Sequence, residues 1–170
     1  VSTSSESVTV VNTAPVFDQG AVIDPTVVEL GMTATCSATA TDPDDGVAGL
    51  SYIWQVNGTQ VSTGVSWLVN SADADVGDAL TCTAVALDFE GNSTTSTSTA
   101  VIVSNTAPVV SGVFLSDLSP YTNDAITVSA SSSDFNGDAV SLTYEWHIID
   151  ASTGQDTIAL TGTGSSFASL

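Results

Sequence analysis

Small apolar residues alternate with hydroxyl residues along the longest patterned stretch of the chain, residues 32–41. The apolar positions are Met32, Ala34, Cys36, Ala38 and Ala40, and threonine or serine fills each position between them. A period of two predicts a β-strand that buries one face. Both cysteines lie on such apolar faces, because residues 80–86 show the same alternation: Leu80, Cys82, Ala84 and Ala86.

Two aromatic rows follow the same period and are expected to face inward. They are Tyr52, Trp54, Val56 and, later in the chain, Tyr144, Trp146, Ile148. Turn-forming clusters separate the predicted strands, and they lie at residues 42–46, 57–58, 75–78, 88–92 and 135–138. Short strands punctuated this often, with no helical period between them, predict an all-β fold built from β-sandwiches.

An internal repeat divides the chain. The segment Asn12-Thr-Ala-Pro-Val16 returns letter for letter as Asn105-Thr-Ala-Pro-Val109, and the Tyr-x-Trp row also occurs once after each copy. A repeat of this length corresponds to one small domain, so the sequence predicts a tandem, elongated array. We expect one complete domain at 12–104 and a second, lacking its last strands, at 105–170.

Residues 1–11 match residues 95–104 and are expected to form the last strand of a preceding domain. Two explanations remain open for why a last strand stands before the first complete domain. The sequence is a window on a longer repeat protein, or strand 1–11 inserts into the open second domain of a neighbouring copy. A donated strand would replace the last strand of the second domain, and the strand before it would remain unaccounted for.

The charge of the chain limits its partners. It carries 19 acidic residues with no lysine or arginine, for a formal net charge of −19. Nucleic acid and anionic membranes both require basic side chains, so neither is expected as a partner. No stretch is apolar for long enough to span a bilayer. Repulsion among the acids must be relieved by water, salt or bound cations.

The cysteine count indicates an oxidising compartment. Cys36 and Cys82 are the only two cysteines and both belong to the first repeat. One pair per domain predicts a disulfide and an extracellular location. Two thiols cannot form a cysteine-rich zinc site, and the one histidine lies in the other repeat.

The order Cys36, Trp54, Cys82 resembles the core of the immunoglobulin fold. Two positions depart from it: Leu80 stands where antibody domains have a tyrosine, and Val128 replaces the first cysteine in the second repeat. With the Asn-Thr-Ala-Pro openings, the Asp/Gly loops, the Tyr-x-Trp strands and residues 77–82, nearly the whole chain resembles the tandem Ig-like, cadherin-like and PKD-like repeats of prokaryotic surface and filament proteins. The resemblance implies an extracellular structural or adhesive role.

Acidic loops are the best candidates for a metal site. In an Ig sandwich the opening of the first strand lies beside two of the loops, which places Asn12 and Asn105 near the acids of their own domains. Calcium binds carboxylate, amide and carbonyl oxygens in such loops. The alternative is that these residues only form turns. The candidate Ca²⁺ ligands are Asp42, Asp44, Asp45, Asp88, Glu90, Asp134, Asn136 and Asp138.

Other chemistry is sparse. His147 is predicted to be an ordinary surface residue, and the carboxylates lack the flanking aromatics of a sugar-cleaving site, so no enzyme is expected. Asn57 and Asn92 begin acceptor sequons for glycosylation. The alternative is that threonine is present at these positions only because it favours exposed strand faces.

Three functions fit these features. The leading hypothesis is a structural module of an extracellular fibre or surface filament, with neighbouring copies or repeats of itself as partners. The alternatives are the projecting stalk of a cell-surface adhesin and an accessory module of a secreted polysaccharide-degrading enzyme, each with a cell-surface or polysaccharide contact.

Overall fold

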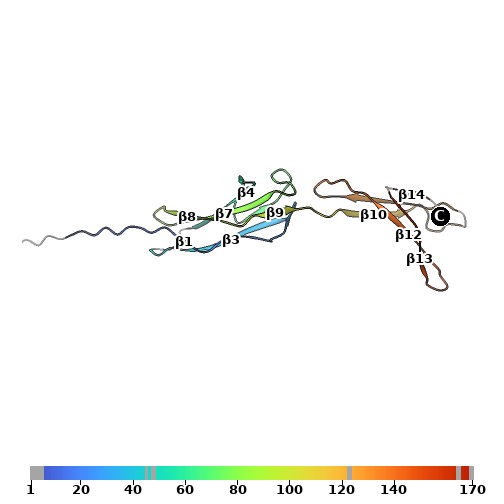
Figure 1. The fold of residues 1–170 in the computed structure, drawn as a ribbon, viewed down its shortest axis with the longest axis horizontal. Helices are drawn as coiled ribbons and strands as arrows, with labels where there is room; N and C mark the ends of the chain where they lie inside the picture. The colour runs from blue at the N-terminus through green and yellow to red at the C-terminus, as the bar shows by residue number, and fades with distance from the viewer. Residues whose placement is uncertain (1–5, 45, 47–48, 122–123, 164–165, 169–170) are drawn as a thin grey trace, which may run out of the picture. The chain divides into compact units, whose positions relative to one another are not determined.

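The computed structural model describes residues 6–44, 46, 49–121, 124–163 and 166–168. Every regular element in these ranges is a β-strand, which confirms the all-β prediction. No helix of the described residues is long and apolar enough to cross a membrane. The chain divides into two compact units, Val1–Asn105 and Thr106–Leu170, shown in Figure 1.

Unit 1 contains two sheets. The first has the order β1-β3-β6, with β1 at Val16–Asp24, β3 at Thr33–Thr41 and β6 at Ser66–Leu68. The second has the order β2-β9-β7-β4-β5, and its strands are β2 (Val28–Glu29), β9 (Val101–Ser104), β7 (Ala79–Leu87), β4 (Gly49–Val56) and β5 (Thr59–Thr63). Strand β8 (Ser93–Thr97) also pairs with β7.

The core of unit 1 lies between these sheets, because the inward residues of both are buried in one cluster. The alternation predicted for β3 and β7 is confirmed: Ala34, Cys36 and Ala38 are buried and Ala40 is half-buried, and all four predicted positions of β7 are buried. Met32 is an exception, since it precedes the first residue of β3 and its side chain is exposed. The tight turn at Gly31 (φ 84°) ends just before Met32, so the Met32 side chain does not follow the alternation of β3.

Trp54 forms the centre of this core. Its side chain is fully buried, it lies opposite Cys82 in the β4–β7 ladder, and its Nε1 donates to the carbonyl oxygen of Gly64 at 2.9 Å. The ring centroid of Trp67 on β6 is 6.0 Å away, at an interplanar angle of 38°. Aromatic rings at this separation stabilise a core beyond the area they bury.

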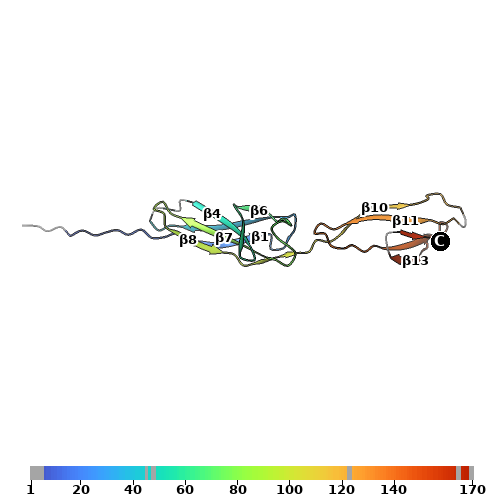
Figure 2. The same ribbon diagram turned by 90° about the horizontal axis from the view of Figure 1, so that it is seen from above.

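Unit 2 contains two small sheets. One has the order β10-β11-β14 and the other pairs β12 with β13; the bounds are β10 (Val109–Leu115), β11 (Thr127–Ser133), β12 (Thr143–Ile149), β13 (Asp156–Thr163) and β14 (Ser166–Ala168). Figure 2 shows β10 beside β11. The pairings match those of unit 1, where β1, β3 and β6 form one sheet and β4 pairs with β5. Even the bulge recurs, directly after Trp54 and directly after Trp146.

The core of unit 2 is less covered than that of unit 1. Val128 is buried, whereas the predicted inward residues Tyr144 and Trp146 are only half-buried. The prediction that Ile148 faces a core is wrong, because its side chain is 49% exposed. It lies past the bulge, near the turn end of the β12–β13 hairpin, and Figure 1 shows this end extending away from β10.

Candidate functional sites

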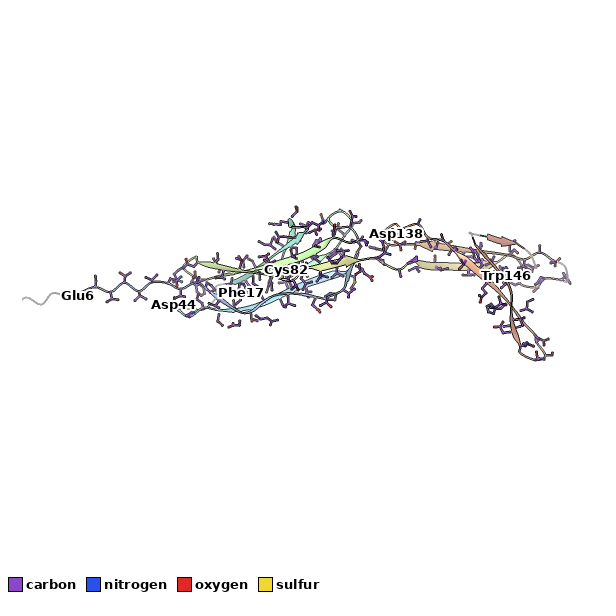
Figure 3. All side chains as sticks on the ribbon, viewed as in Figure 1. Glu6, Phe17, Asp44, Cys82, Asp138 and Trp146 are labelled. Atoms are coloured by element: carbon purple, nitrogen blue, oxygen red, sulfur yellow. A yellow bond between two sulfur atoms is a disulfide. The ribbon has the colours of Figure 1, made fainter. Side chains whose placement is uncertain are left out.

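The predicted disulfide is confirmed. Cys36 on β3 and Cys82 on β7 are joined, with their Cα atoms 6.4 Å apart, and both side chains are buried. The bond therefore connects the two sheets of unit 1 through the middle of the core, as Figure 3 shows at the Cys82 label. A structural disulfide of this kind is typical of proteins outside the reducing cytosol.

The opening segment of unit 1 meets two of the acidic loops. Asn12 Nδ2 donates to Asp88 Oδ2 at 2.8 Å, and the backbone N–H of Thr13 donates to Asp44 Oδ2 at 2.6 Å. Figure 3 shows Asp44 at the end of unit 1 where the segment carrying Glu6 enters. The structure thus brings Asn12, Asp44 and Asp88 to one place, as the resemblance implied.

Asp88 is the most enclosed of these acids, with only 2% of its surface exposed. Burial by itself raises the pKa of its carboxyl group. Hydrogen bonds from the Asn12 side chain and from the backbone N–H groups of Asn92 and Gly91 outweigh that effect, so the pKa of Asp88 is lowered. The carboxylate closes the 88–92 turn, since Asn92 N donates to Oδ1 at 2.7 Å. The sequence predicted a turn at 88–92, but not the burial of Asp88 or its bond to Asn12.

An open groove of 530 Å³ lies beside this junction. It is lined by Val10, Val11, Asn12, Pro43, Asp44 and Glu90. Asp42 Oδ1 accepts a hydrogen bond from the backbone N–H of Asp44 at 2.9 Å. Asp45 lies outside the described residues. Within the described ranges, no three acidic, histidine or cysteine side chains gather closely enough to hold a metal ion.

The matching loop of unit 2 has a similar arrangement. Asp134 Oδ1 accepts the backbone N–H groups of Asn136 and Asp138, at 3.0 and 3.3 Å. Asn136 Nδ2 donates to Asp138 Oδ2, and Asn136 Oδ1 accepts the N–H of Thr106 at 3.2 Å. Two oxygens here, Asp134 Oδ2 and Thr106 Oγ1, are buried without a hydrogen-bond partner. The three predicted ligands of this loop therefore lie together.

His147 has two acidic partners that the sequence did not reveal. Its Nδ1 lies 2.8 Å from Asp156 Oδ1 and its Nε2 lies 2.6 Å from Glu145 Oε1. The hydrogen bond to Asp156 raises the pKa of the imidazole most, and the bond to Glu145 adds to it. Glu145 stands two residues before His147 on β12, where a period of two places both on one face. Asp156 comes from β13, so only the hairpin register could identify it.

The two sequons lie on the surface of unit 1. Asn57 starts the tight turn between β4 and β5 with a φ of 50°, and its side chain is already engaged. Asn57 Nδ2 donates to Asp78 Oδ1 at 2.7 Å and its Oδ1 accepts the N–H of Ala79. Asn92 is exposed at the end of the 88–92 turn.

Comparison with protein-family models, curated proteins and solved structures finds no match for this chain. Its function must therefore be argued from its own residues and geometry.

Proposed function

We propose that this chain is a structural module of an extracellular fibre or surface filament, built from repeated immunoglobulin-like β-sandwich domains. The observation that carries the proposal is the internal repeat. The Asn-Thr-Ala-Pro-Val segment and the Tyr-x-Trp row occur twice, and the strands around them pair in the same way, β4 with β5 and β12 with β13. Modules repeated along one chain stack on their neighbours, and their usual role is to give the protein length.

Two further features support an extracellular structural role. The disulfide joins the two sheets of unit 1, and such bonds persist outside the cytosol. The surface carries no lysine or arginine, so a dense negative charge keeps the modules solvated and limits non-specific association. Both features suit a protein that persists outside the cell.

Calcium belongs to this proposal as a stiffening ion. The loops at Asp44 and Asp88 in unit 1, and at Asp134 and Asp138 in unit 2, meet the opening segments of their own units. Oxygen ligands of this type suit calcium, and a bound cation would offset the repulsion among the carboxylates. A cation that held each loop to the opening segment of its unit would make the chain bend less where that unit begins.

The test is immunogold labelling of intact source cells with antibodies raised against residues 12–104. Regular labelling along filaments or across a surface layer is expected. Labelling only inside permeabilised cells would refute the proposal. Labelling confined to isolated projections that end in another domain would instead support the adhesin stalk. The matched control is antibody that has been absorbed with the purified 170-residue chain.

A further inference from the structure

The Asn-Thr-Ala-Pro segment is held by the unit that follows it, and the same contact occurs in both units. The backbone N–H of Thr13 donates to Asp44 Oδ2 at 2.6 Å in unit 1. The backbone N–H of Thr106 donates to Asn136 Oδ1 at 3.2 Å in unit 2. Both partners occupy equivalent positions of the internal repeat. The acceptor oxygen is therefore kept, although a carboxylate in unit 1 becomes an amide in unit 2.

The loop that supplies this oxygen is folded in the same way in both units. Its first aspartate accepts the backbone N–H of the residue two positions later: Asp42 Oδ1 at 2.9 Å in unit 1 and Asp134 Oδ1 at 3.0 Å in unit 2. An aspartate that bonds to the backbone two residues on forms a local turn. The loop makes this turn from its own residues, so the acceptor side chain is positioned without help from the opening segment.

Unit 1 holds its opening segment at further points. Asn12 Nδ2 donates to Asp88 Oδ2 at 2.8 Å, on one side of the bond from Thr13. On the other side the ring of Pro15 is fully buried, and the carbonyl oxygen of Pro15 accepts the hydroxyl of Thr94 at 2.7 Å. The segment is therefore part of the folded body of unit 1 and not a loose linker in front of it.

The chain between the held parts of the two units is short. Ser104 is the last residue of β9 and pairs with β2 in unit 1, and Thr106 is bonded in unit 2, so one residue, Asn105, lies between them. A flexible segment spans roughly 5–6 Å times the square root of its residue number. Release of Thr106 would add Thr106 and Ala107, up to the fixed ring of Pro108, and would raise this span to roughly 10 Å.

We propose that Asp44 and Asn136 are latch residues. Each holds the opening segment of its own unit by a direct hydrogen bond to a threonine N–H, and this bond limits how far the chain bends where the unit begins. The bond joins two groups of the protein, so the latch works in the absence of calcium. The inference rests on the proposed structural role and names the residues that stiffen the array.

Amide hydrogen exchange measured by NMR on the full chain in EDTA tests the latch. The N–H groups of Thr13 and Thr106 should be protected. Asp44→Ala should speed exchange at Thr13 by about tenfold, because bonds to charged acceptors are the stronger ones. The matched control Asp44→Asn removes the same charge but keeps an acceptor oxygen, so it should retain most of the protection. Asn136→Ala should speed exchange at Thr106 by about threefold. Asp138→Ala removes only the partner of Asn136 Nδ2 and should leave that rate unchanged.

Nitrogen-15 relaxation of the same samples measures the stiffness of the chain between the units. The two units of the wild-type chain should share one rotational correlation time, and Asn136→Ala should give each unit its own. Unchanged strand amide signals show that the variants fold. The proposal is overturned by unprotected Thr13 and Thr106 in the wild-type chain, by exchange rates that the alanine variants leave unchanged, or by separate correlation times in the wild type. None of these outcomes changes the immunogold labelling, so the structural role is judged separately.

Discussion

Removal of the Cys36–Cys82 disulfide, by changing both residues to alanine, should strongly destabilise unit 1. The bond closes a loop with a sequence separation of 46 residues. In the chain-entropy treatment, a loop of this length restricts the unfolded chain by about 13 cal/mol/K, which is about 4 kcal/mol at 25 °C. Whole domains are stable by roughly 5–15 kcal/mol, so the variant should retain little margin.

Urea unfolding followed by tryptophan fluorescence measures this effect. A background change of Trp146→Phe leaves Trp54 and Trp67, both in unit 1, as the only fluorescent indoles. At a denaturant slope of about 1.5 kcal/mol/M, a loss of about 4 kcal/mol lowers the urea midpoint by roughly 2–3 M. The slope itself reports whether the unfolded state has expanded.

Reduction of the parent protein should produce a similar loss, while the same reductant should leave the double variant unchanged. A second variant, Cys36→Val with Cys82→Ala, places valine where unit 2 has Val128. It restores packing at that position without the cross-link, so it should recover no more than about 1 kcal/mol. A total loss below about 1 kcal/mol in the alanine variant would refute the argument from loop entropy.

Three further predictions concern charge. Because the pKa of Asp88 is lowered, its carboxylate contributes stability above pH 3.8 that is lost as the pH falls through the lowered value. Asp88→Asn should therefore weaken the fall in the free energy of unfolding of unit 1 as the pH drops below 3.8, as measured by urea unfolding at a series of pH values. The proton NMR titration of the single histidine should give a pKa above 6.5, and Asp156→Asn should lower it while Asp138→Asn leaves it unchanged. The raised pKa means that the stability His147 contributes is complete below pH 6.5 and is lost as the pH rises through the folded value. Finally, millimolar calcium should raise the melting temperature by several degrees relative to EDTA, and Asp134→Ala should abolish the part that belongs to unit 2; equal melting temperatures in both buffers would contradict the calcium proposal.

The sequence predicted the core of unit 1 well because its strands bury one face each. A strict period of two identified the buried positions of β3 and β7, including both cysteines. The alternation could not show where β3 begins, so Met32 was included although a turn precedes it. Strand ends depend on turn geometry, which a period does not encode.

The remaining errors and omissions come from contacts between distant segments. The pattern at Tyr144 and Trp146 continued to Ile148, but only packing from another element would bury that side chain. Asp156 reaches His147 through the hairpin register, and Asp88 is enclosed through a bond from Asn12. An Asp in a Gly-rich turn has the same sequence appearance whether it is exposed or fully enclosed.

The position of the disulfide also decides how unit 1 would respond to tension. Force applied between its first and last residues passes through β3 and crosses to β7 at the sulfur atoms, so residues 37–81, between the two cysteines, carry no load. If the surrounding strands were pulled apart, the chain of unit 1 would lengthen only by the segments outside this loop. At about 3.5 Å per extended residue, roughly 160 Å of chain would stay slack. Cleavage of that single bond would release this length of chain, so the redox state of its surroundings would set the maximum extension of unit 1.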